Sequence, residues 1–319
     1  MGLIRSFCFN CQQPNYFGLF TYNDDWQYTT IELSTGNTNK SQSISLDTSG
    51  IVFSILNISD NGDSVLSIVA DGNIFALTSF NSLDNQFKIF SNVSNDITFE
   101  FQFQPVSYDA KTNKAYYVSL VQVAYDDILS IMEFNFNTHQ VSIFEVRATL
   151  QLQGLPIGVY DSDSNIFYSF VVDKHQIQYI LSHSIATQKD LVNTLNITFN
   201  DGPSSLFYHN QYLYLCQMST ETGNTFIYRF NTTSWSHETI YSGANTYFLG
   251  MMQPFYQSNN YIVIFNQNEI QQPISIDYLN LDNLNVTTST GLNNTIPKAK
   301  DGYYFGQAYT SEYNHLIPV

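Results

Sequence analysis

The stretch that decides the fold is Glu133-Phe134-Asn135-Phe136-Asn137-Thr138, an alternating apolar strand that ends in a short polar turn. Apolar residues at every second position are typical of a strand with one buried face. The pattern occurs six times at a spacing of roughly 50 residues, so the sequence predicts six repeated units of about that length. The other five copies occupy residues 31–36, 77–82, 181–187, 227–232 and 276–282.

A second pattern lies ahead of the first in most units and centres on a tyrosine. It occupies residues 106–109, 158–161, 206–209, 254–257 and 307–310. After the tyrosine come a turn rich in Gly, Asn or Asp and a further apolar strand, as in residues 114–118. Each unit therefore contains four short strands in succession.

Six units of four strands resemble the blades of a β-propeller. We therefore predict an all-β fold, a six-bladed β-propeller of four-stranded antiparallel blades. Residues 16–25 match the second strand of a unit with its turn, and residues 303–309 supply the missing first strand. Pairing of these N- and C-terminal strands would close the ring and remove its exposed edges. The tail Leu316-Ile317-Pro318-Val319 resembles a competing strand, and its role stays open.

The composition fits one large β domain. Hydrophobic residues make up 43% of the 319 positions, with 25 Phe and 23 Tyr, so a sizeable core is available. We predict a single domain over residues 1–319, with residues 1–14 as an N-terminal segment ahead of the first strand. The Trp-Asp, kelch double-glycine, Tyr-Trp-Thr-Asp and Asp-box signatures are absent from the sequence, so the resemblance names no specific propeller family.

The charge excludes some partners and leaves the compartment open. A net charge of −16 would repel a nucleic-acid backbone, and no apolar run is long enough to span a membrane. The sequence therefore predicts an acidic, soluble chain, with the cytoplasm slightly favoured. Gly2 and Ser6 match a myristoylation pattern that would add a lipid anchor, with Cys8 and Cys11 available for a second one.

Seven sequons for N-linked glycosylation would instead fit an extracellular protein, although a chain so rich in Asn, Ser and Thr produces about this many by chance. Used sequons and the lipid anchor point to different compartments, and the sequence does not decide between them. The sequons begin at Asn39, Asn57, Asn92, Asn196, Asn231, Asn285 and Asn293.

Carboxylates recur in the turns between the second and third strands of the predicted blades. If the fold is a propeller, these turns share one face, which would carry an acidic rim able to take a basic peptide or a divalent cation. The same residues are also common in tight turns for purely structural reasons. The candidate ligand-binding residues are Asp24, Asp25, Asp126, Asp127, Glu221 and Glu269, with Asp71 and Asp173 at the equivalent turns.

A second candidate set consists of the glutamines Gln104, Gln153, Gln253 and Gln307, which we place at the innermost strands. A ring of amides at the channel would hydrogen-bond a polar ligand such as a sugar; the structural alternative is that these amides pair with neighbouring backbone groups. Single histidines and the absence of a nucleophile motif predict no catalytic residues, no resident metal and no cofactor other than calcium.

The sequence therefore predicts a non-catalytic binding module that presents one propeller face to a protein or glycan ligand. The alternative is a calcium-dependent hydrolase similar to propeller lactonases, with its site at the channel mouth. A lectin with repeated aromatic pockets is a third hypothesis, which the divergence of the units disfavours. The identity of the ligand and the oligomeric state do not follow from the sequence.

Overall fold

We describe the protein from a computed structural model. The structure describes residues 15–23, 25–35, 37–44, 51–58, 64–71, 74–94, 106–123, 126–146, 150–154, 156–198, 200–219, 221–243, 255–258, 260–267, 273–290 and 304–309. The segments 1–14 and 310–319 lie outside this set, and with them the predicted acylation sites and the tail strand.

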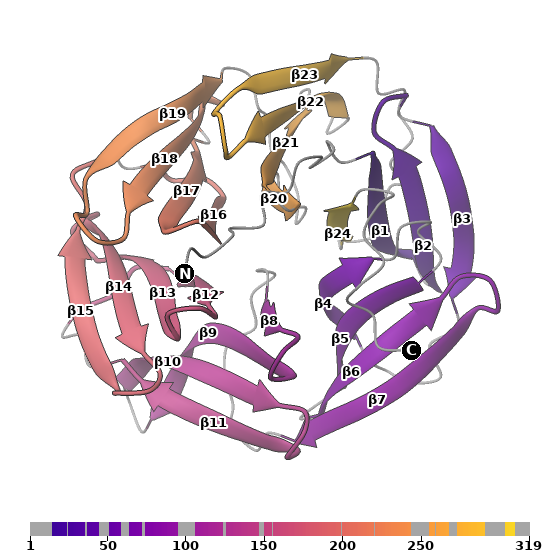
Figure 1. The fold of residues 1–319 in the computed structure, drawn as a ribbon, viewed down its shortest axis with the longest axis horizontal. Coiled ribbons are helices and arrows are strands. Elements are labelled where there is room, and N and C mark those ends of the chain that lie inside the picture. Colours follow the sequence, from indigo (N-terminus) through magenta and orange to yellow (C-terminus); the bar gives the residue numbers. More distant parts are fainter. Residues whose placement is uncertain are drawn as a thin grey trace, which may run out of the picture.

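The described residues form six four-stranded antiparallel sheets, arranged as a ring around a central axis (Figure 1). The fold is an all-β propeller, as the sequence predicts. The ring closes where β24 near the C-terminus pairs with β1 near the N-terminus, in a register that sets Tyr16 opposite Tyr309. Blade I is thus built from both ends of the chain, which confirms the predicted closure.

In each blade the strands are named A to D from the centre outward. Blade I consists of β24 (Tyr304–Tyr309), β1 (Tyr16–Asn23), β2 (Asp25–Glu32) and β3 (Thr38–Ile44). Blade II consists of β4 (Ile51–Ile58), β5 (Ser64–Asp71), β6 (Ile74–Asn81) and β7 (Gln86–Ser94). Blade III consists of β8 (Ser107–Asp109), β9 (Lys114–Val123), β10 (Asp126–Asn135) and β11 (Gln140–Glu145).

The remaining three blades follow in chain order. Blade IV consists of β12 (Ile157–Asp161), β13 (Ile166–Val172), β14 (Gln178–Ser184) and β15 (Lys189–Thr194). Blade V consists of β16 (Ser204–His209), β17 (Tyr212–Met218), β18 (Thr225–Asn231) and β19 (His237–Gly243). Blade VI consists of β20 (Phe255–Ser258), β21 (Tyr261–Gln267), β22 (Pro273–Asn280) and β23 (Val286–Thr290).

This topology gives the ring two different faces. The A–B and C–D turns lie on one of them, which we call the AB face. The B–C turns and the D–A connections lie on the other, which we call the BC face. Because neighbouring strands are antiparallel, every residue at the end of strand B or the start of strand C lies at the BC face.

The C–D turns explain the polar ending of the repeated pattern. Asn135 Oδ1 accepts hydrogen bonds from the backbone N–H groups of Asn137 and Thr138, at 3.1 and 3.2 Å. Asn81, Asn231 and Asn280 cap the equivalent turns in the same way. A left-handed residue then closes each of these turns and one more, in blade IV: Asn85, His139, Gln188, Trp235 and Leu284, with φ of 59°, 56°, 52°, 56° and 60°.

The recurrent tyrosine of strand A holds the A–B turn. The Tyr108 hydroxyl donates to Asn113 Oδ1 at 2.9 Å, and the Tyr160 hydroxyl donates to Asn165 Oδ1 at 2.7 Å. Both asparagines are left-handed, with φ of 53° and 57°, a conformation that Asn tolerates better than most residues. In blades III and IV the tyrosine is therefore part of the blade's own turn.

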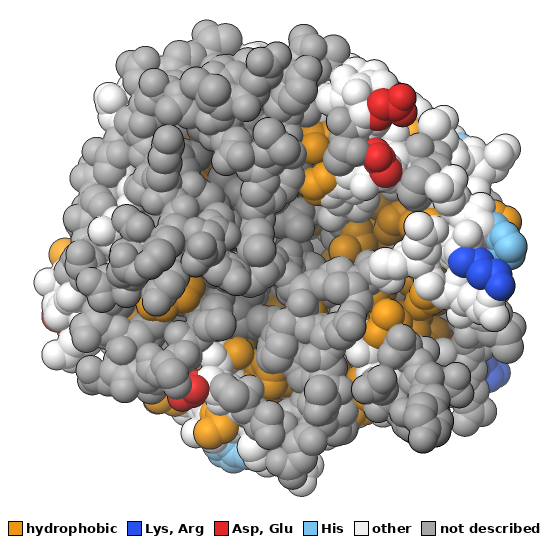
Figure 2. Space-filling model, turned by 180° about the vertical axis from the view of Figure 1, so that it is seen from behind, with side chains coloured by type: hydrophobic (Ala, Val, Ile, Leu, Met, Phe, Trp, Pro, Cys, Tyr) orange, Lys and Arg blue, Asp and Glu red, His pale blue; other side chains and the backbone are white. Residues whose placement is uncertain are grey.

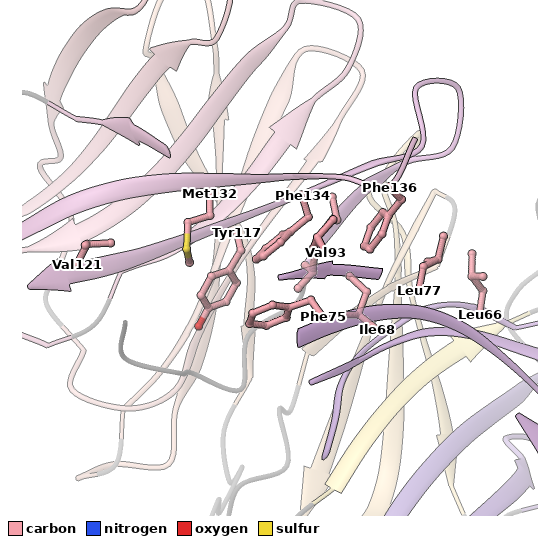
Figure 3. Packing of buried hydrophobic residues seen from close by; sticks show 12 residues of the cluster. Leu66, Ile68, Phe75, Leu77, Val93, Tyr117, Val121, Met132, Phe134 and Phe136 are labelled. Carbon is pink, nitrogen blue, oxygen red and sulfur yellow. The ribbon is translucent and has the colours of Figure 1, made fainter. Parts of the chain in front are cut away.

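The core is divided among the six seams between neighbouring blades. Among the described residues each seam holds one cluster of buried apolar side chains. At the II–III seam Phe75 packs against Phe134 with ring centroids 4.7 Å apart, and Met132 and Tyr117 extend the contact (Figure 3). Strands B and C are buried on both faces, whereas strand D borders solvent, as the mostly exposed residues of β15 show.

Candidate functional site

The BC face holds the predicted acidic residues for which the structure gives a position. Asp25 begins β2, and Asp126 and Asp127 begin β10, so their backbones lie at this face in blades I and III. Glu221 lies in the turn between β17 and β18 of blade V, and its side chain is exposed. The fold thus brings these four residues to one face, while Asp24 and Glu269 lie outside the described residues.

The acidic side chains described at the B–C turns are those of Asp71, Asp173 and Glu221, and the acidic rim stays a prediction. Figure 2 shows one side of the molecule, on which a few described Asp and Glu side chains are visible in red. Two exposed isoleucines also lie at B–C turns: Ile74, which begins β6 and is 46% exposed, and Ile177, which precedes β14 and is 41% exposed. The BC face therefore combines carboxylates with exposed apolar side chains.

Asp173, at the B–C turn of blade IV, has a structural role in that turn. Its Oδ1 accepts the backbone N–H groups of His175 and Ile177 at 2.8 and 2.9 Å, and its Oδ2 accepts the Tyr179 hydroxyl at 3.1 Å. Burial acts to raise the pKa of Asp173, but these hydrogen bonds outweigh it and the pKa lies below its usual value. Both oxygens of this carboxylate thus accept hydrogen bonds from residues in or beside its own turn.

The structure places two of the four glutamines of the predicted ring, one of them away from the innermost strand. Gln153 lies outside the strands, ahead of β12, with an exposed side chain, and its backbone N–H donates to the carbonyl of Val172 at 2.7 Å. The placement of Gln153 on an innermost strand was wrong, because the segment before β12 pairs with the B–C end of its own blade. Gln307 does lie on β24, and Gln104 and Gln253 lie outside the described residues.

Carboxylates on the AB face serve the turns in which they lie. Asp109 accepts the backbone N–H of Lys111 at 3.0 Å and the hydroxyl of Thr112 at 2.7 Å. Asp161 accepts the backbone N–H groups of Asp163 and Ser164 at 3.1 and 3.3 Å, and both aspartates are buried. Their hydrogen bonds explain why Asp follows the tyrosine in blades III and IV.

A polar cluster at the III–IV seam escaped sequence reasoning. The Tyr116 hydroxyl donates to Glu133 Oε2 at 2.9 Å, and Lys114 Nζ lies 2.9 Å from Glu133 Oε1. Tyr160 stacks on Tyr116 with ring centroids 3.9 Å apart. Burial first, and then the hydrogen bonds with Tyr160 and Glu133, raise the pKa of Tyr116 well above its usual value. The charge of Glu133 is thus buried but compensated.

A second missed cluster joins blades IV and V near the BC face. Gln217 Nε2 donates to Gln178 Oε1 at 2.8 Å, and Gln178 Nε2 donates to the carbonyl of Ile197 at 3.3 Å. Both glutamines are buried. Their sequence separation and the ordinary composition around them gave no signal, because the contact exists only once two blades are packed together.

Among the residues that the structure describes, no group of three His, Cys, Asp or Glu side chains is close enough to hold a metal ion. The same described segments contain no helix with the length and hydropathy needed to cross a membrane.

The comparisons with known proteins bear on the fold. No protein-family model matches the sequence, and no curated protein matches it significantly. The structure is similar to TolB from Acinetobacter baumannii, with a TM-score of 0.55 and 8% identity over 92% of this chain and 66% of that one. It is also similar to a chain in the nidogen/laminin complex, with a TM-score of 0.52 and 10% identity over 93% and 100% of the two chains.

The chain thus spans slightly less than two thirds of the TolB chain. At identities this low the similarities concern the arrangement of strands and carry no residue of a site across. They agree with the blade topology described above, and the chain is a β-propeller by fold.

Proposed function

We propose that this propeller is a binding module that presents its BC face to a protein partner. The observation that supports this most is the exposure of Ile74 and Ile177 at B–C turns, on the face that also carries Glu221. Apolar side chains surrounded by polar ones are the usual composition of a protein-binding surface.

Charge supports a partner with a basic segment. The chain carries a net charge of −16, and the BC ends of blades I, III and V carry Asp25, Asp126, Asp127 and Glu221. The AB-face carboxylates Asp109 and Asp161, by contrast, are held in hydrogen bonds within their turns. Complementary charge raises the association rate and suppresses wrong partners more than it adds affinity.

One structural neighbour offers a parallel. The second of these similar structures is a chain from the complex of nidogen with laminin, which is a pair of proteins. This similarity favours a protein ligand over a glycan ligand. It identifies no contact residues in this chain.

The test compares the two faces directly. A photo-reactive amino acid replaces Ile177 on the BC face in one variant and Leu83, in the C–D turn of blade II, in another. Leu83 is 71% exposed, so it controls for simple accessibility. We expect protein adducts from position 177 at several times the yield from position 83 after irradiation in extracts of the native source. Equal yields, or adducts that contain carbohydrate in place of protein, would contradict the proposal.

A charge variant sharpens the test. Asp126→Asn with Glu221→Gln removes two negative charges from the BC face, and Asp84→Asn with Asp163→Asn removes two from exposed positions on the AB face. The first pair should lower the adduct yield at position 177 and weaken its dependence on salt, because screening acts on the charges that attract the partner. The second pair should leave the yield unchanged.

A further inference from the structure

Exposed apolar side chains and sequons for N-linked glycosylation lie together on or beside three of the outermost strands of the ring, the D strands. Strand D of each blade has one unpaired edge, which is a hazard for aggregation unless it is covered. Of the exposed large apolar side chains in the described part of the chain, four lie on D strands: Ile89 on β7, Leu191 and Val192 on β15, and Val286 on β23.

Sequons lie on or beside these same three strands. Asn92 is within β7, Asn196 follows β15, and Asn285 directly precedes β23. The two other D strands with described side chains, β11 and β19, neither contain nor adjoin a sequon, and they present none of the exposed large apolar residues. Among the D strands with described side chains, the sequons thus lie at the three that expose large apolar residues and at neither of the other two; a further sequon, at Asn39, lies on β3, whose side chains are outside the description.

The three sequons are open to modification. The asparagine and the hydroxyl residue two positions later are exposed in each pair: Asn92 with Ser94, Asn196 with Thr198, and Asn285 with Thr287. Within the described residues none of the three asparagine side chains takes part in a hydrogen bond. Each amide nitrogen is therefore accessible without disruption of the fold.

The sequon at Asn231 provides an internal contrast. Asn231 Oδ1 accepts the backbone N–H groups of Thr233 and Ser234, both at 2.9 Å, and the Ser234 hydroxyl at 3.2 Å. Its side chain is only partly exposed and caps the C–D turn of blade V. Glycosylation would modify Nδ2 and leave Oδ1 as an acceptor, so the contrast lies in access: these bonds hold the amide of a half-buried residue in its turn, whereas the other three asparagines are exposed.

We infer that Asn92, Asn196 and Asn285 carry N-linked glycans that cover the apolar edges of blades II, IV and VI. The donor is an oligosaccharide linked through a diphosphate to a polyprenyl lipid. The bond from sugar C1 to the diphosphate breaks, a bond from C1 to Asn Nδ2 forms, and Nδ2 loses one proton. The sugars would lie on the perimeter of the ring, which leaves the BC face open to a partner, and the protein would pass through the secretory pathway.

The test is a peptide map of the protein from its native source after enzymatic removal of N-glycans in heavy-oxygen water. The amidase converts each occupied asparagine to a labelled aspartate. We expect the label at positions 92, 196 and 285 and none at 231. A protein that carries no sugar, or one labelled at 231 but not at the three perimeter positions, would overturn the inference.

A set of variants removes each sequon but keeps its asparagine, so that a loss of glycan is not confused with a folding defect. Ser94→Ala, Thr198→Ala and Thr287→Ala alter exposed hydroxyl residues, and each should lower the intact mass by one glycan. Thr233→Ala removes the sequon at Asn231 and should leave the mass without the loss of a glycan. A loss of sugar in this control, with none in the other three, would again overturn the inference.

Discussion

Blade III packs against blade II through a cluster of apolar side chains, whereas its contact with blade IV also includes a polar cluster. Toward blade II, Phe134 packs against Phe75, and Tyr117 and Met132 continue the apolar contact (Figure 3). Toward blade IV, the apolar middle of the seam ends in a polar cluster at the AB face, where Glu133 accepts from Tyr116. Tyr116 and Tyr117 are neighbours in the sequence, as are Glu133 and Phe134, so β9 and β10 each contribute side chains to both seams.

One seam requires only a pattern of apolar residues, whereas the other requires particular side chains that contact one another. The II–III seam needs only apolar side chains of suitable volume at every second position, which the sequence displays openly. The polar end of the III–IV seam needs Glu133, Tyr116 and Lys114 together, because a buried carboxylate without partners would be costly. The stability of such a cluster therefore depends on which side chain replaces each of its members, and not only on the volume of that side chain.

The largest expected effect is in the apolar seam. Phe134→Ala removes a fully buried ring and should lower the free energy of unfolding by about 3–5 kcal/mol, through lost burial and the cavity left behind. Chemical denaturation at neutral pH measures this loss. Phe144→Ala, at the partly buried outer side of the III–IV seam, is the control and should cost clearly less. Equal losses would mean that the II–III seam relaxes around the cavity.

The polar cluster should show an effect of intermediate size that depends on chemistry. Glu133→Ala leaves the buried Tyr116 hydroxyl without its acceptor and should cost about 1–3 kcal/mol. Glu133→Gln keeps an acceptor oxygen and nearly the same volume, so it should cost less, with the contact to the partly exposed Lys114 as the main loss. The same denaturation experiment on both variants decides the matter. A glutamine variant as unstable as the alanine variant would show that charge dominates this cluster.

Much of this fold follows from the sequence because its signals are local. The polar ending of the repeated strand reflects the C–D turn that Asn135 caps, and the tyrosine pattern reflects the bond from Tyr160 to Asn165. Each of these contacts joins residues within one turn. Six repeats with the same local devices therefore predict the blades and the closure by β24 and β1.

The candidate site follows from the sequence only in part. The fold places Asp126 and Glu221 at the BC face as expected, because their positions relative to the strand ends are local. Gln153 was misplaced because its segment pairs with strand β13, and the bond from Gln217 to Gln178 was missed because it joins two blades. Contacts between blades depend on a register that no single unit reveals, and whether the acidic residues bind a ligand remains a prediction.

The other end of the III–IV seam gives the smallest effect and the clearest dependence on pH. Tyr179 belongs to the apolar cluster of that seam and donates to Asp173 at the BC face. Because the folded-state pKa of Asp173 lies below its value in the unfolded chain, the charged form stabilises the fold. This contribution is complete above the unfolded pKa of about 4 and disappears as the pH falls through the lower folded value.

Asp173→Asn keeps an oxygen for the turn but cannot ionise, so the stability difference between parent and variant should shrink as the pH falls from about 6 to 2. Denaturation curves across that range measure it. Tyr179→Phe removes one donor to the carboxylate, which should move its folded pKa toward the usual value and weaken the same acid dependence. A difference between parent and Asp173→Asn that stays constant with pH would show that hydrogen-bond geometry alone, and not the charge, holds this end of the seam.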